Sequence, residues 1–259
     1  MLRSLKALAD AQSMLPATRT AQLANGPMEY VVAGDGEPTV LLIGGLGVPI
    51  DGWALVLPEL ARSGTVVAFN RRGRGFPAQA RPQTGSAVVD VLRELLAAAG
   101  ATPPYVLVGH AVGGLYANLY ARRFPHELAG LVLLEPTHPA DQLHERRLRF
   151  LPPARRARGA RRPDEQRFLR ETAAQIEQAG PFPDVPLIVV SGSKTPPRWA
   201  MSPERIRTHA ARQLELARLS ALGRHTVAPA SGHFPQVTDP AVVVRAVRDV
   251  AGAGAGAGA

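Results

Sequence analysis

Short apolar runs alternate with helix-like stretches along most of this chain, and that alternation limits the folds open to it. The apolar runs lie at residues 39–43, 65–69, 105–108, 131–134 and 186–190. Stretches with the composition of helices lie between them, at residues 53–62, 86–99, 112–123 and 206–222. None of the runs alternates apolar with polar residues, which is typical of strands covered on both faces. The order predicts an α/β fold with a mostly parallel central sheet flanked by helices.

The remaining segments predict how the chain is organised around this sheet. Asn25-Gly26 precedes the apolar segment 28–32 and predicts an antiparallel hairpin at the sheet edge. Residues 139–184 break the alternation, because they show no convincing strand and contain Pro152-Pro153 and Pro163. We predict an N-terminal extension at 1–20, a core at 21–138 and 185–250, a helical cap insertion at 139–184, and a disordered Ala/Gly tail at 251–259.

The basic charge of the chain is concentrated in arginine. The formal net charge is +9, Lys6 and Lys194 are the only lysines, and many arginines fall within residues 146–170. A solvated polar face is the simplest interpretation of such a run. Docking of an acidic acyl carrier protein or an anionic substrate is the alternative. Since no aromatic residues are interleaved with the arginines, we do not expect nucleic acid as a partner.

The composition also limits the cellular location and the kinds of reactive site that we expect. No uncharged apolar run is long enough to predict a transmembrane helix. The first 20 residues contain an acid and several polar residues and lack the apolar core of a secretory signal, so we expect a cytoplasmic protein with no membrane partner. The chain has no cysteine, which excludes disulfides, thiolate zinc sites and a cysteine nucleophile. We expect no metal and no cofactor.

The segment Gly109-His110-Ala111-Val112-Gly113 joins an apolar run to a helix-like stretch. A tight strand-to-helix turn needs small residues on both sides of its central position, and Gly109 and Gly113 supply them. The pattern resembles the G-x-S-x-G nucleophile elbow of the α/β-hydrolase superfamily, and the resemblance extends over roughly residues 26–250. It implies an α/β-hydrolase fold with position 111 as the nucleophile. Alanine stands there instead of serine.

Two further segments resemble the same superfamily. Gly44-Gly45-Leu46-Gly47 follows the run 39–43, where members carry a loop that donates one backbone N–H to an oxyanion hole. The resemblance implies the N–H groups of Leu46 and Val112 as the oxyanion donors. The turn at 70–75 is similar to the superfamily's D-x-x-G-x-G pattern but has Asn70 at its first position.

The resemblance also implies the order nucleophile, acid, histidine for the rest of a catalytic triad. His233, in the segment Ser231-Gly232-His233-Phe234-Pro235 near the C-terminus, matches the catalytic histidine loop. The loop after the run 186–190 contains no carboxylate, whereas the preceding run ends at Glu135. Some members carry their acid there, so we expect Glu135 to orient His233. We assign His110 to the packing of the elbow, and His126, His138, His144, His209 and His225 to no site.

Three functions are compatible with these residues. The first is a serine hydrolase that forms an acyl-enzyme, here inactivated by alanine at position 111. The second uses the His233–Glu135 pair as a general base in non-hydrolytic chemistry, as a lyase, a cyclase or a cofactor-free oxygenase. The third is a non-catalytic binder.

The substrate is predicted only through the resemblance. The opening segment 28–34, the early acid and the helical insertion resemble stand-alone esterases and thioesterases, including those that release polyketide or polyether chains from carrier proteins. This implies an ester or thioester of a small molecule or of a carrier-bound acyl chain.

Overall fold

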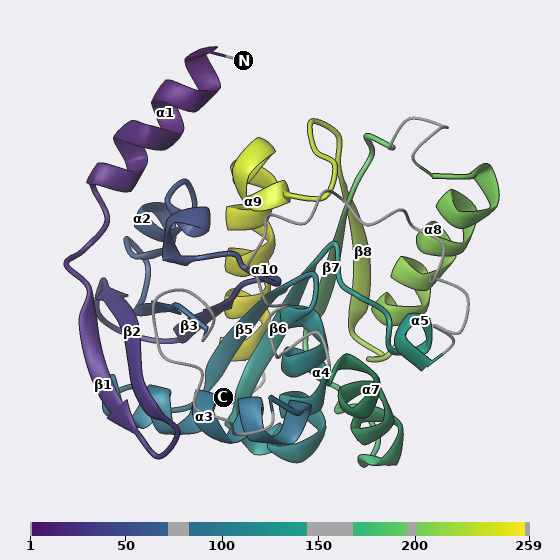
Figure 1. Cartoon of the computed structure of the whole chain (residues 1–259), viewed down its shortest axis with the longest axis horizontal. Helices are drawn as coiled ribbons and strands as arrows, with labels where there is room; N and C mark the ends of the chain where they lie inside the picture. The colour runs from purple at the N-terminus through teal and green to yellow at the C-terminus, as the bar shows by residue number, and fades with distance from the viewer. Residues whose placement is uncertain (1, 72–82, 144–167, 196–200, 257–259) are drawn as a thin grey trace, which may run out of the picture.

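The computed structural model of the chain describes residues 2–71, 83–143, 168–195 and 201–256. Eight strands form one sheet in the order β1-β2-β4-β3-β5-β6-β7-β8 (Figure 1). Their bounds are β1 Arg19–Leu23, β2 Gly26–Ala33, β3 Thr39–Ile43, β4 Val66–Phe69, β5 Tyr105–His110, β6 Leu128–Leu134, β7 Leu187–Gly192 and β8 Gly223–Ala228. Pairing is antiparallel for β1–β2 and β2–β4 and parallel between all other neighbours. The predicted mostly parallel sheet and the edge hairpin are confirmed.

Helices cover both faces of the sheet. On one face lie α3 (Gly85–Ala98), α4 (Gly113–Arg123), α7 (Leu169–Gln178) and α8 (Pro203–Ala217). On the other lie the 3₁₀ helix η1 (Ile50–Trp53), α2 (Leu57–Leu60) and α10 (Pro240–Gly256). The shorter elements are α5 (Pro139–Leu143), η2 (Pro125–Glu127) and α9 (Pro235–Thr238), while α1 (Leu2–Ser13) projects away from the sheet (Figure 1). None of the helices in the described part of the chain combines the length and apolar composition needed to cross a bilayer.

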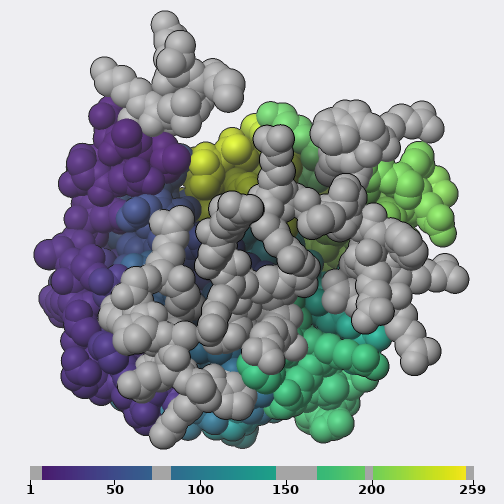
Figure 2. Space-filling model, viewed as in Figure 1, coloured from purple at the N-terminus to yellow at the C-terminus, as the bar shows by residue number. Residues whose placement is uncertain are grey.

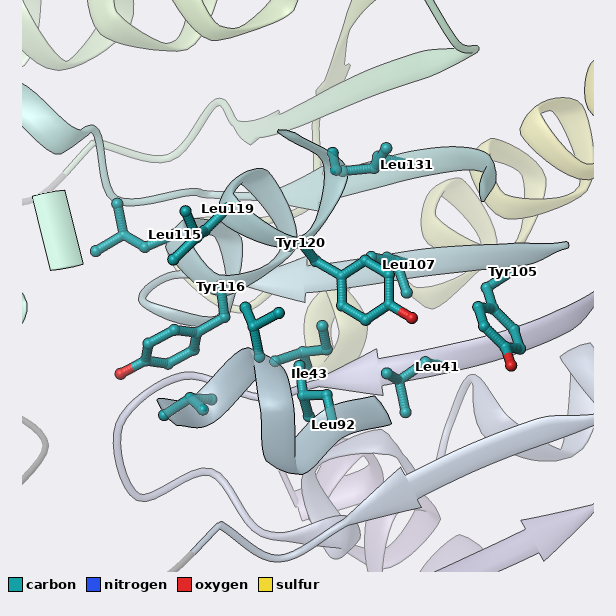
Figure 3. Close-up of a cluster of buried hydrophobic side chains, with 14 of the residues drawn as sticks. Leu41, Ile43, Leu92, Tyr105, Leu107, Leu115, Tyr116, Leu119, Tyr120 and Leu131 are labelled. Atoms are coloured by element: carbon teal, nitrogen blue, oxygen red, sulfur yellow. The ribbon is translucent and has the colours of Figure 1, made fainter. Parts of the chain in front are cut away.

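Apolar side chains fill the space between the sheet and each helical layer. Leu41 and Ile43 of β3, Leu107 of β5 and Leu92 of α3 are fully buried and meet side chains of α4 (Figure 3). Consecutive residues of a strand face opposite sides, so Leu42, between Leu41 and Ile43 in β3, packs against the other helical layer. Burial on both faces is the reason these strands appear in the sequence as continuous apolar runs.

Two helix predictions need correction. The stretch 53–62 is not one helix but η1 and α2, because Pro58 lies in the first turn of α2 and lacks the N–H that would continue an earlier helix. The stretch 206–222 is helical only as α8, from Pro203 to Ala217. The strand β8 follows it and was not predicted, since its edge position lets polar Arg224 and Thr226 remain in an otherwise extended segment.

The predicted insertion and tail are described in part. Within 139–184 the described elements are α5 and α7, and α7 packs against α3 and α4. The rest of the predicted cap and most of the arginine cluster fall at residues 144–167, outside the described residues, so the cap remains a prediction. The disorder predicted from residue 251 is wrong up to Gly256, because α10 continues to that residue. Alanine favours helix, and Gly254 lets α10 lie against Ala129, where a Cβ would be 2.7 Å from the Ala129 carbonyl oxygen.

Candidate active site

The turn between β5 and α4 has the geometry of a nucleophile elbow. Ala111 follows β5 directly and has φ +49°, in the left-handed region that a non-glycine residue adopts at a cost. Its N–H donates to the Leu134 carbonyl at 3.0 Å, and its carbonyl accepts from the N–H groups of Gly114 at 3.0 Å and Thr137 at 3.1 Å. The strained residue is therefore fixed to the end of β6 by its own backbone. Its side chain is 7% exposed.

Glycines permit the close packing that this turn requires. A Cβ on Gly113 would lie 2.1 Å from the Ile43 carbonyl oxygen of β3, and one on Gly109 would lie 2.8 Å from the Gly113 carbonyl oxygen. Real Cβ atoms do not approach other heavy atoms so closely, and here the neighbours are backbone. The strand β5 and the start of α4 can approach β3 only because these positions have no side chain.

The loop after β3 lies against the elbow. A Cβ on Gly45 would be 3.2 Å from the Ala111 Cβ and 3.0 Å from the His110 Nδ1, so the backbone of Gly45 is in contact with position 111. Gly44 is packed equally closely, since a Cβ there would be 2.9 Å from the Val48 carbonyl oxygen. The structure thus brings Gly44, Gly45 and the elbow together.

Arg71 holds the carbonyl groups of this loop. Its guanidinium donates to the Gly44 carbonyl and, at 2.8 Å, to the Gly45 carbonyl. Since the C=O and N–H of a trans peptide point in opposite directions, binding the Gly45 carbonyl turns the Leu46 N–H away from Arg71. Among the described residues, neither the Leu46 N–H nor the Val112 N–H donates to another backbone group. The two predicted oxyanion donors stay a prediction, and sequence reasoning missed the part played by Arg71, which binds the loop carbonyls.

Glu135 lies immediately after β6 and also has a positive φ, of +44°. Its side chain is only 8% exposed. One carboxylate oxygen, Oε1, accepts the Gly192 N–H at 2.8 Å. The other, Oε2, lies 3.6 Å from His233 Nδ1 and 3.1 Å from His209 Nε2. Burial alone would raise the pKa of Glu135, but the hydrogen bonds from His209 and Gly192, together with the nearby His233, lower it to about 2. The carboxylate is thus ionised at neutral pH.

The loop after β7 carries no carboxylate, yet it holds the acid and the histidine together. Gly192 donates to Glu135, and a Cβ on it would be 2.3 Å from the Gly232 carbonyl oxygen. Lys194 N–H donates to the Ser231 carbonyl at 2.8 Å. These backbone contacts place His233 beside Glu135 with Nδ1 toward the carboxylate. The His233 side chain is 54% exposed.

His110 packs beneath this loop, as expected. It is 1% exposed, and its ring lies 5.1 Å from the His233 ring and 5.2 Å from the Phe234 ring. Its Nε2 is 2.8 Å from the His233 carbonyl oxygen, so Nε2 carries the proton and donates, while Nδ1 has no hydrogen-bond partner among the described residues. Burial lowers the pKa of His110 to about 4, which keeps the ring neutral.

The structure also corrects the expectation for His209, which the sequence assigned to no site. His209 projects from α8 onto Glu135. Its position could have been inferred only from the contact of α8 with the end of β6. Elsewhere on α8, Gln213 donates to the Pro136 carbonyl at 3.1 Å and fixes the helix there. The structure thus brings His233 and His209 to Glu135, the residue after Leu134, whose carbonyl accepts the Ala111 N–H.

Comparison with known proteins places this chain in a family. A model of the alpha/beta hydrolase family matches residues 40–246. Similar solved structures include a thermophilic esterase from Thermogutta terrifontis, with a TM-score of 0.63 and 22% identity, covering 90% of this chain and 97% of that one. The carboxylesterase CesB from Bacillus subtilis has a TM-score of 0.63 and 15% identity, with 96% and 97% covered. At these identities the likeness shows the fold.

Relatives by sequence match over shorter stretches. The chain is 30% identical over 104 residues to the uncharacterized protein YqjL of Bacillus subtilis, covering 40% of this chain and 41% of YqjL. It is 40% identical over 113 residues to the protein named as a carbamate hydrolase, RutD, of Variovorax paradoxus, covering 42% of each. The matched stretches thus span less than half the length of these two relatives. Since the family model matches most of the chain and the fold agrees with it, this protein belongs to the alpha/beta hydrolase family.

Proposed function

We propose that this site is built for acyl transfer from an ester or thioester, with Ala111 in the place of the serine nucleophile. One observation carries the proposal: among the described residues, the non-glycine positions with positive φ are Ala111 and Glu135, and both lie in the site. Strained backbone of this kind costs about 1–3 kcal/mol at each position and persists where function requires it. The membership of the chain in a hydrolase family supports the same chemistry.

A serine at position 111 would complete a sequence of balanced steps. His233 Nε2 would take the hydroxyl proton as the oxygen attacks the substrate carbonyl, and Glu135 would stabilise the imidazolium. The N–H groups of Leu46 and Val112 would bind the oxyanion. The proton on His233 would then pass to the leaving alcohol or thiol, and water would release the acid by the same route. With alanine no acyl-enzyme forms, because a methyl group has no lone pair.

Ser191 is a poor substitute for the missing nucleophile. Its Oγ lies 2.8 Å from His225 Nε2, so it forms a serine–histidine pair. However, it lies within β7, is 9% exposed, and is separated from β5 by β6. The predicted oxyanion donors belong to the β3 and β5 ends of the site. Burial lowers the pKa of His225, and we interpret the pair as internal packing under α8.

We infer the substrate class from the proteins that this chain resembles. The esterases among the structural neighbours and the relative named as a carbamate hydrolase share attack on a carbonyl carbon bonded to a heteroatom. We propose an ester or thioester of a small molecule or of a polyketide-type acyl chain on a carrier protein, with the cytoplasm as its place of action. The arginines of residues 146–170 would suit an acidic carrier protein.

The test is a comparison of the chain with its Ala111→Ser variant on short-chain p-nitrophenyl esters and N-acetylcysteamine thioesters. We expect serine to raise turnover by several orders of magnitude, since loss of a triad serine costs on the order of a million-fold. A fluorophosphonate should label position 111 in that variant. The matched control is Ala111→Ser combined with His233→Gln, which should lose both turnover and labelling.

A second function is favoured by the intact base. Glu135 and His233 remain paired while position 111 carries only a methyl group, an arrangement that suits proton abstraction in an elimination, cyclisation or cofactor-free oxygenation. If Ala111→Ser gives neither turnover nor label against the ester and thioester panel, the hydrolase proposal fails and this second function becomes the one to test. A binder without catalysis would show no turnover in either form.

A further inference from the structure

One oxygen of Glu135 is shared by two histidines. Oε1 accepts the Gly192 N–H at 2.8 Å, and both histidines approach the other oxygen, Oε2. His209 Nε2 lies 3.1 Å from Oε2, within hydrogen-bonding distance. His233 Nδ1 lies 3.6 Å from the same atom, beyond an ordinary hydrogen bond. In this arrangement the residue assigned as the base has the weaker contact with its orienting acid.

The fold explains why His209 reaches this oxygen. Residues four apart on a helix share one face, so His209 and Gln213 point in the same direction from α8. Gln213 is 1% exposed and bonds the Pro136 carbonyl, while the C-terminal residues Leu216 and Ala217 of α8 are buried against the sheet. The helix is therefore anchored, and its preceding turn carries His209 directly over residue 135. Its side chain is 41% exposed, so protons exchange freely with solvent.

The charge on His209 changes what Glu135 can offer His233. A hydrogen bond to Glu135 raises the pKa of His209, with a smaller contribution from Asp141 of α5. Arg205 and Arg212 lie one turn before and after it on α8. A protonated His209 neutralises part of the carboxylate charge and repels an imidazolium at His233, whereas a neutral His209 still occupies Oε2 but adds no charge.

We propose that His209 is a positioning residue that competes with His233 for Oε2 of Glu135 and thereby limits how strongly the carboxylate supports the base. This inference rests on the proposed function for its catalytic meaning. The competition itself is a property of the chain as it stands, with Ala111 in place.

The first experiment measures the competition without any activity. Histidine ring resonances of the chain with Ala111 are followed by NMR against pH, and His233 is assigned from its absence in His233→Asn. His209→Gln keeps a neutral donor of similar reach, so we expect the pKa of His233 to rise by about half a unit or more. His209→Arg keeps a permanent positive charge, so we expect no rise or a fall.

His138→Gln is the matched control, because His138 Nε2 faces Glu215 at 3.3 Å instead of Glu135 and should leave His233 unchanged. A merely structural role for His209 predicts the same response to Gln and Arg. The proposal is overturned if the His233 pKa in both His209 variants stays within about 0.2 units of the parent.

Activity then gives the catalytic consequence in the Ala111→Ser background. We expect His209→Gln to move the acid limb of the kcat/KM profile to higher pH by the same shift and to leave KM within about twofold, since the residue acts through Glu135. If Ala111→Ser is inactive, the proposed function fails while the NMR result still decides the competition. If Ala111→Ser is active and adding His209→Gln leaves its kcat/KM profile unchanged, the catalytic part of this inference is wrong.

Discussion

At the elbow end of the site, position 111 is held by backbone hydrogen bonds, whereas at the acid end side-chain contacts add to the backbone ones. Ala111 is bonded through its N–H and carbonyl to Leu134, Gly114 and Thr137, and glycines let β3 and α4 close around it. Glu135 instead depends on His209, His233 and the Gly192 N–H. Since no bond at the elbow uses the side chain of residue 111, the elbow keeps its geometry with alanine there.

The two ends also lie on different parts of the chain. The elbow and the glycine-rich loop after β3 come from β3, β5 and α4 near the middle of the sheet, while the histidines come from α8 and from the loop before α9 (Figure 1). Seen on the molecular face of Figure 2, the hairpin β1–β2 (purple) and α8 (green) lie on opposite flanks. We expect the stability of the elbow end, which depends on close backbone packing, to respond to added side-chain volume. We expect the stability of the acid end, which depends on charged groups, to respond to pH.

The largest effect should come from breaking the packing of the elbow. Gly113→Ala would place a Cβ 2.1 Å from the Ile43 carbonyl oxygen, so β3 and α4 must separate. We expect the free energy of unfolding to fall by about 3 kcal/mol or more, measured by urea denaturation. Gly252→Ala is the control, because nothing lies within 4 Å of that position in α10 and the change should stabilise by about 1 kcal/mol. Equal responses would contradict the packing argument.

The next effect separates the two ends by pH. His110 has a pKa of about 4 against an ordinary 6.5, so the unfolded chain binds this proton first and stability falls as pH drops from 6.5 to 4. Glu135 has a pKa of about 2 against 4.5, so its contribution is complete above 4.5 and is lost as pH drops toward 2. Each loss should be on the order of 3 kcal/mol.

Thermal unfolding measured against pH tests these two ranges with one variant each. His110→Asn should flatten the fall between pH 6.5 and 4 relative to the parent chain, and Glu135→Gln should flatten the fall between 4.5 and 2. The same dependence in parent and variant would mean that neither group is responsible.

A smaller effect should come from the turn that departs from the family pattern. Asn70 accepts the Ile50 N–H at 2.9 Å and donates from Nδ2 to Glu29 Oε2 at 2.9 Å. Asn70→Asp would restore the family residue but set two carboxylates against each other. We expect a loss of about 1–2 kcal/mol at pH 7 that shrinks as pH falls and one carboxylate is protonated. Combining it with Glu29→Gln should recover most of the stability; no recovery would show that Glu29 is not the cause.

The smallest effect should come from position 111 itself. Ala111→Gly relieves a left-handed residue of about 1 kcal/mol of strain, and the greater freedom of glycine in the unfolded chain offsets a similar amount. We expect the free energy of unfolding to change by no more than about 0.5 kcal/mol. Ala117→Gly, inside α4, should cost about 1 kcal/mol or more. If both cost the same, position 111 is not strained.

Much of the site was predictable because it depends on local sequence. Strands buried on both faces appear as apolar runs, and the glycines at 44, 45, 109 and 113 mark the places where backbones meet. His233 was predictable from its loop and Glu135 from its position after a buried strand. His209 was not, because an exposed histidine on an amphipathic helix has no local signal for the partner it will meet.

The sequence by itself determined the fold class, the tight turn at Ala111 and the glycine-rich loop after β3, because steric limits on the backbone act between neighbouring residues. Only the tertiary structure decided which histidine lies closer to the Glu135 carboxylate. That depends on the distance of His209 and His233 from one oxygen, which is set by the packing of α8 and of the β7 loop against the end of β6. Glu135, His209 and His233 lie far apart in the chain, and no local sequence pattern predicts which histidine comes closer to the carboxylate.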